Sequence, residues 1–164
     1  MTTLVLGLGN DLLSDDGFGL AAARALRPEF QGRDDVEVVE SSLAGLALLD
    51  LLIGYDRAII IDGIRTGRVP AGTLIELTAD DLDRVIAPSP HYAGLPELLA
   101  VAHGLDLAFP RDVRILAMET EDSHTIGEGL SGPVQRALPE AVARVRELIQ
   151  ADVAAGPVTE VDHA

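Results

Sequence analysis

Short apolar runs alternate along the chain with segments whose apolar residues recur at helical spacing. The runs are rich in Val, Ile and Leu and end at glycine or polar turn residues, so they predict strands. These strands are expected at residues 3–8, 36–39, 57–62, 73–77 and 113–118. The run RAIIID at 57–62 is the clearest, with three consecutive isoleucines before an acid and a glycine.

Helical spacing predicts helices between the strands. They are expected in the Ala-rich segment that follows Gly17 up to Leu26, stopping before Pro28, and then over 43–53, from Leu95 onward, and over 134–149. Ser14 or Asp15 is expected to cap the first helix through its side chain. The last helix has the cleanest apolar face, with Arg and Glu between the apolar positions.

Strands that alternate with helices, several of them apolar throughout, are typical of a mainly parallel sheet covered on both faces. We therefore predict a single-domain, three-layer α/β fold over residues 1–150. The helical period is lost from about Ala151, so residues 151–164 are expected to form a flexible tail.

Composition narrows the chemistry that is available. The chain has 164 residues, 12 basic against 27 acidic, and a net charge of −15. This surplus of acid argues against binding nucleic acid or an anionic membrane, because both need a basic face. All basic residues are arginine and cysteine is absent, which excludes Schiff-base chemistry, thiolate nucleophiles, zinc ribbons and iron–sulfur clusters.

The amino-terminal segment MTTLVLGLG lacks the basic region of a signal peptide, and no apolar stretch approaches the length of a membrane span. A cytoplasmic protein without membrane insertion is therefore expected. Nothing in the sequence requires more than a monomer.

The segment Gly7-Leu8-Gly9-Asn10 after the first strand suggests a dinucleotide-binding turn. That motif also needs a glycine three positions after the second one, so that the helix can pack on the strand. Leu12 stands there instead. We therefore interpret Gly7 and Gly9 as a tight turn from strand to loop, and a nucleotide-binding module remains a rival interpretation.

Two acids stand out by position. Asp62 ends the most apolar strand, and the carboxyl ends of parallel strands face the ligand crevice of an open α/β sheet. Asp16 lies on the loop after the first strand, which belongs at the same edge. The alternative for Asp62 is a turn-forming Asp-Gly pair, and for Asp16 a carboxylate that interacts with the helix dipole.

Among the histidines, His91 is the best ligand candidate, because it lies in a proline-rich loop before a helix at the expected rim of the crevice. His103 precedes Gly104 at a helix end, where capping is the simpler interpretation. His124 has no evident partner, and His163 falls in the tail. Two carboxylates and an imidazole together would suit a borderline divalent metal such as nickel or zinc.

A serine hydrolase is not favoured, because no serine lies in a G-x-S-x-G elbow. The sequence does resemble the hydrogenase maturation endopeptidases. The resemblance rests on a combination of motifs spread over most of the chain: LVLGLGNDLLSDDGFG at 4–19, AIIIDG at 58–63, SPHYAGLPELL at 89–99 and ETEDSHTIGEGLS at 119–131.

The resemblance implies an endopeptidase that removes the C-terminal extension of a nickel–iron hydrogenase large-subunit precursor. It assigns nickel contacts to Asp16, Asp62 and His91, with the nickel brought by the precursor's own cysteines. Asp16 stands where the family often has Glu, and Pro90 where a small hydroxyl residue is expected more often. Polarisation of the scissile bond by the metal and water activation by an aspartate both remain open. The alternative function is a non-proteolytic nickel-binding accessory protein using the same trio.

Overall fold

The computed structural model describes residues 1–79, 81 and 95–154. A five-stranded sheet forms its centre, in the order β2-β1-β3-β5-β4. The strands are β1 (Thr3–Leu8), β2 (Val36–Ser41), β3 (Arg57–Ile64), β4 (Leu74–Thr78) and β5 (Asp112–Glu119). Four strands run parallel and β4 pairs antiparallel with β5 at one edge. The predicted α/β class is confirmed.

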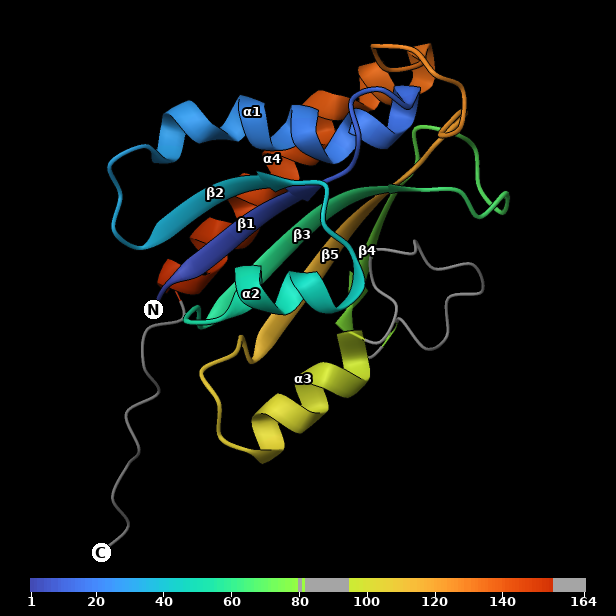
Figure 1. Cartoon of the computed structure of the whole chain (residues 1–164). Helices are drawn as coiled ribbons and strands as arrows, with labels where there is room; N and C mark the ends of the chain where they lie inside the picture. The colour runs from blue at the N-terminus through green and yellow to red at the C-terminus, as the bar shows by residue number, and fades with distance from the viewer. Residues whose placement is uncertain (80, 82–94, 155–164) are drawn as a thin grey trace, which may run out of the picture.

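The helices cover both faces of the sheet (Figure 1). They are η1 (Ser14–Gly17), α1 (Phe18–Phe30), η2 (Gly45–Ala47), α2 (Leu48–Leu52), α3 (Leu95–Gly104) and α4 (Gly132–Ala154). Because successive strand residues face opposite sides, Ile59 and Ile61 pack in the core under α1 and α4. Ala58 and Ile60 pack in the second core, with α2 and α3.

Several predicted boundaries were wrong. The first helix passes through Pro28 and ends at Phe30, since a proline in the last turn removes one N–H donor without reversing the chain. The segment 43–53 forms only the short η2 and α2. The last helix continues to Ala154, beyond the predicted start of the tail. Residues 155–164 lie outside the description, so the tail beyond Ala154 stays a prediction.

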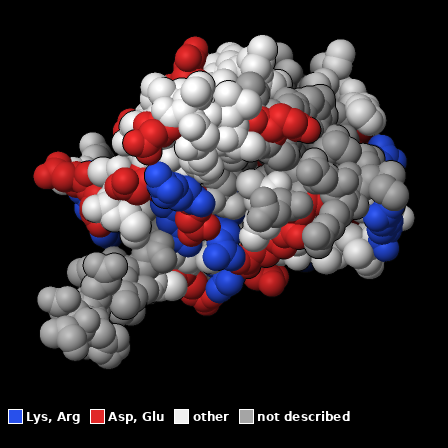
Figure 2. All heavy atoms as spheres, turned by 90° about the horizontal axis from the view of Figure 1, so that it is seen from below, with Lys and Arg blue, Asp and Glu red and all other residues white. Residues whose placement is uncertain are grey.

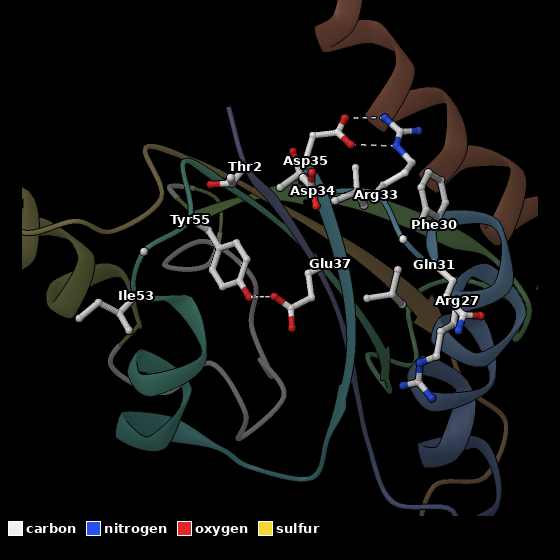
Figure 3. A pocket seen from close by; sticks show the side chains of 15 residues that line it. Thr2, Arg27, Phe30, Gln31, Arg33, Asp34, Asp35, Glu37, Ile53 and Tyr55 are labelled. Atoms are coloured by element: carbon white, nitrogen blue, oxygen red, sulfur yellow. Dashed lines mark hydrogen bonds and ion pairs between the residues drawn. The ribbon is translucent and has the colours of Figure 1, made fainter.

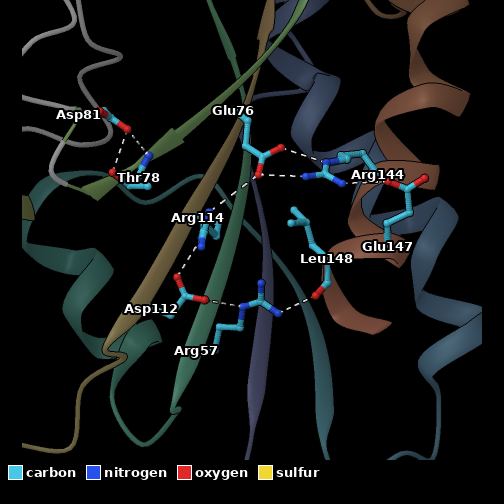
Figure 4. Close-up of polar contacts among 9 residues, drawn as sticks. All are labelled: Arg57, Glu76, Thr78, Asp81, Asp112, Arg114, Arg144, Glu147 and Leu148. Atoms are coloured by element: carbon cyan, nitrogen blue, oxygen red, sulfur yellow. Dashed lines mark hydrogen bonds and ion pairs between the residues drawn. The ribbon is translucent and has the colours of Figure 1, made fainter. Parts of the chain in front are cut away.

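At the amino-terminal end of the strands, a buried arginine ties the sheet to α4 (Figure 4). The Arg57 guanidinium lies 3.0 Å from an Asp112 carboxylate oxygen and donates a 2.7 Å hydrogen bond to the Leu148 carbonyl. The long carboxyl-terminal helix is thereby held at its far end, while its beginning lies near the opposite edge of the sheet.

The surface seen from below is mainly uncharged, with acidic side chains spread across it and basic ones in small groups (Figure 2). Several of the arginines pair with acids, as in the contacts of Arg24 with Asp11 and Glu40 at 2.6 and 2.8 Å. No described helix has both the length and the apolar character needed to span a bilayer.

Candidate active site

The strand order places the topological switch point, where a ligand crevice is expected, at the carboxyl ends of β1 and β3. The chain leaves β1 toward β2 on one side and later returns to β3 on the other side of β1. Ligands of open α/β sheets bind where the connections diverge in this way. The connections that meet at this edge include the β1–α1 loop with η1, the segment after β2, the β3–β4 loop, and the segment after β5.

Glycines bring the start of α1 down onto these strand ends. A Cβ atom on Gly7 would lie 2.2 Å from the Gly19 carbonyl oxygen, and one on Gly19 would lie 2.2 and 2.3 Å from the carbonyl oxygens of Leu8 and Ile61. Gly7 therefore lies inside β1 and allows the helix to approach, which corrects its interpretation as a turn residue. The close helix–strand packing expected of a dinucleotide turn is achieved by Gly19 rather than at position 12.

Gly9 allows the loop after β1 to fold back on itself. Its φ is +149°, and a Cβ there would lie 1.8 Å from the Asp16 carbonyl oxygen. The Asn10 amide also donates to that carbonyl at 3.2 Å. The loop after β1 thus folds back so that Asp16 returns to the end of the strand.

Asp62 lies at the same place on the neighbouring strand. It is fully buried, and β3 extends two residues beyond it to Ile64, further than predicted. A Cβ on the adjacent Gly63 would lie 3.0 Å from the Asp15 carbonyl oxygen. The η1 turn, which carries Asp16, therefore rests directly against the segment of β3 that carries Asp62.

Asp15 has a different function from the predicted helix cap. Gly17 is the N-cap of α1 and no side chain caps either η1 or α1. The fully buried Asp15 carboxylate instead accepts hydrogen bonds from the loop after β5. Its donors are the amides of Glu121, Asp122 and Ser131 at 2.9, 3.1 and 2.7 Å, and the Ser131 hydroxyl at 2.8 Å.

A second buried acid secures the β3–β4 loop. Glu119, at the end of β5, accepts hydrogen bonds from the Thr66 amide and hydroxyl and from the Gly67 amide, at 2.8–2.9 Å for the shortest contacts. Both loops that flank the crevice are therefore held by carboxylates that are not themselves site candidates. Sequence reasoning missed these two roles, because each acid and its partners are far apart in the chain.

The loop after β5 also contains an acid that stays ionised. The Thr125 hydroxyl and the amides of Thr125 and His124 donate to the Asp122 carboxylate and lower its pKa to about 2. His124 itself is exposed. His103 lies at the end of α3, where its Nε2 contacts the Pro110 carbonyl oxygen at 2.9 Å, so it joins α3 to the following loop rather than capping its own helix.

His91 lies outside the described residues. The structure therefore describes only two members of the predicted trio, Asp16 and Asp62. Among the described residues, no three His, Asp or Glu side chains are grouped in a way that could hold a metal ion. The structure brings Asp16 and Asp62 to one edge of the sheet.

A cavity of about 670 Å³ lies elsewhere, along the free edge of β2 (Figure 3). Two of its lining carboxylates have partners within the lining: Arg33 forms a two-pronged ion pair with Asp35, and Tyr55 donates a hydrogen bond to Glu37. Partial burial and the Glu37 carboxylate raise the pKa of Tyr55 to about 12. Neither Asp16 nor Asp62 lines this cavity.

Comparison with known proteins identifies the family of this chain. Residues 20–148 match the family model described as hydrogenase maturation protease. The chain belongs to this family. The family match covers Asp62 and both loops that flank the crevice downstream, and confirms the resemblance seen in the sequence motifs.

Individual relatives support the same assignment. The chain is 30% identical to the hydrogenase expression/formation protein HupD of Rhizobium leguminosarum, covering 85% of this chain and 69% of that protein. It is 28% identical to the hydrogenase 2 maturation protease of Escherichia coli, over 90% and 92% of the two chains. The hydrogenase maturating endopeptidase HybD from E. coli has a similar structure, with a TM-score of 0.80, 28% identity and coverage of 93% and 94%.

Proposed function

We propose that this protein is the endopeptidase that removes the C-terminal extension of a nickel–iron hydrogenase large-subunit precursor after nickel insertion. Membership of the maturation protease family supports peptidase activity on a hydrogenase precursor. The observation that supports the site is the contact of η1, which carries Asp16, with the end of β3, which carries Asp62, where the connections of β1 and β3 diverge.

In this proposal the nickel is part of the substrate, held by the precursor's cysteines, and this chain contains none of its own. Asp16, Asp62 and His91 complete the coordination of that nickel. Carboxylate and imidazole are suitable ligands for such a borderline ion. His91 precedes α3 by four positions, and α3 packs through Leu99 on the face of the sheet that also holds Ile60 and, by alternation, Asp62.

The buried position of Asp62 suits this task. A carboxylate on a central strand, with backbone packed on both sides, is held in one place before the substrate arrives. Ligands positioned in advance recognise a metal geometry with less loss of conformational entropy. Recognition of the bound nickel would then make cleavage conditional on metal loading.

Cleavage of the purified precursor tests the proposal. The protein is incubated with nickel-loaded and nickel-free precursor, and the products are weighed by mass spectrometry. We expect the loaded precursor to lose its C-terminal peptide and the nickel-free precursor to keep its full mass. If the loaded precursor binds but keeps its mass, the protein is instead a nickel-binding accessory factor.

Matched variants test the two acids. Asp16→Asn and Asp62→Asn are each expected to lower the cleavage rate at least about 100-fold while the thermal midpoint changes by only a few degrees. Asp106→Asn is the control, since its side chain is 94% exposed and precedes β5 at the opposite edge of the sheet. A large fall in stability with Asp62→Asn would indicate that this carboxylate is structural.

A further inference from the structure

Two aliphatic side chains project into solvent beside the candidate site. Ile126 is 85% exposed, the most exposed of the large hydrophobic side chains in the described part of the chain, and Leu12 is 59% exposed. Leu12 lies on the loop that leads to Asp16, and Ile126 lies on the loop after β5. Single exposed aliphatic residues are common on protein surfaces, so their exposure alone carries no conclusion.

The backbone beneath these two side chains joins them. The Gly127 amide donates to the Leu12 carbonyl at 3.0 Å, and the Ser14 amide donates to the Gly127 carbonyl at 2.9 Å. Leu13 and Gly127 form a parallel bridge. Leu12 and Ile126 therefore lie at one short stretch of backbone pairing, which joins two loops that are more than 100 positions apart in the sequence.

Ile126 is held outward by anchors on both sides. On one side, the Ser14 hydroxyl donates to the Thr125 carbonyl at 3.2 Å and the Asp122 carboxylate accepts from the Thr125 amide at 2.9 Å. On the other side is the pairing of Gly127. The Asp15 carboxylate fastens the same loop at its two ends. A β-branched residue in such a frame has little freedom to fold back onto the protein.

The charge of this loop indicates the chemistry of its partner. Residues 119–131 include four acids and no Lys or Arg. Glu121 and Glu128 are exposed, and the lowered pKa of Asp122 keeps that group negative. An apolar pair with a negative surround complements a protein surface that has apolar side chains and a basic margin.

We infer that Leu12 and Ile126 form a docking contact, the site rim, for the folded surface of the protein substrate next to the segment that enters the crevice. This inference rests on the proposed function, because it takes the precursor as the occupant. Leu12 lies on the same loop as Asp16, so a protein that places its chain at Asp16 and Asp62 has the site rim next to it. Preformed aliphatic contacts lower the cost of ordering the interface.

The test compares substrates of different size. The double variant Leu12→Ser/Ile126→Ser is expected to raise KM for the full-length, nickel-loaded precursor about tenfold with little change in kcat. The matched control is Ile53→Ser, an isoleucine that is 56% exposed and lies before β3 at the opposite edge. Cleavage of a short nickel-binding peptide that spans the junction should be the same for the wild type and the double variant, because such a peptide is too short to reach the site rim.

Binding measured by calorimetry separates this inference from the proposed function. Both precursor forms are titrated into the wild type, the double variant and the control at low and high salt. A tenfold loss of affinity in the double variant supports the site rim, and it does so even if the wild type cleaves nothing, an outcome that would overturn only the proposed function. Equal affinity of the wild type and the double variant, an equal loss in Ile53→Ser, or no binding by the wild type overturns the inference.

Discussion

Removal of the Asp15 carboxylate should unfasten the loop after β5 and lower the stability of the whole domain. The carboxylate is fully buried and accepts four hydrogen bonds of 2.7–3.1 Å. A hydrogen bond to a charged group contributes about 1.5–3 kcal/mol, and the contributions of neighbours do not add fully. Water can reach some of the freed amides, so we expect Asp15→Ala to cost roughly 3–5 kcal/mol.

Asp15→Asn gives a graded test of the same contacts. Oδ1 accepts from one donor and Oδ2 from three. The asparagine amide group would therefore take the Oδ1 position, where it faces a single N–H, and the remaining oxygen would keep the other three bonds. The variant loses one hydrogen bond, and its amide N–H faces a backbone N–H. Together these changes should lower the free energy of unfolding by about 1–3 kcal/mol.

Urea unfolding measures both variants, with hydrogen exchange of the Glu121 and Ser131 amides as a local readout. For a domain of this size, the expected loss with alanine lowers the thermal midpoint by roughly 6–20 °C. Asp50→Ala is the control, because Asp50 is exposed on α2, and its effect should stay within about 0.5 kcal/mol. If Asp15→Ala lies within 1 kcal/mol of the wild type, or if both amides keep their protection, the carboxylate does not hold the loop.

Two further predictions concern the packing and the pH response of the site. Gly19→Ala should lower the free energy of unfolding in urea by at least about 3 kcal/mol, because the added methyl group meets backbone carbonyls that cannot move aside. The control is Gly104→Ala, which should be nearly neutral because a Cβ there meets nothing within 4 Å. Similar losses of stability in both variants would contradict the packing argument. The pKa of Asp122 is about 2 in the folded chain against an ordinary value of 3.8, so its contribution to stability is present above about pH 4 and is lost as the pH falls toward 2. NMR titration of its carboxyl carbon should show this midpoint, and a midpoint near 4 would mean that the turn after Asp122 does not form.

The strands and the position of the candidate acids follow from local sequence. A run such as RAIIID by itself predicts a buried strand, because a strand that is apolar on both sides must be covered on both faces of the sheet. The rule that ligands bind beyond the carboxyl ends of parallel strands then selects Asp62 without knowledge of the strand order. Helix ends were predicted less well, since Pro28 and the segment 43–53 depend on what packs against them.

What the tertiary structure alone decides is which acids are structural. Asp15 and Asp16 are adjacent and chemically alike, and the sequence suggested for Asp15 a helix cap that the structure does not contain. The sequence by itself determined the α/β class, the family motifs and the absence of thiolates. The fold then assigned Asp15 to the loop more than 100 positions away, placed η1 against Gly63 next to Asp62, and paired Leu12 with Gly127 next to Ile126. These are contacts between distant segments, and their partners become visible only when the sheet brings the loops to one edge.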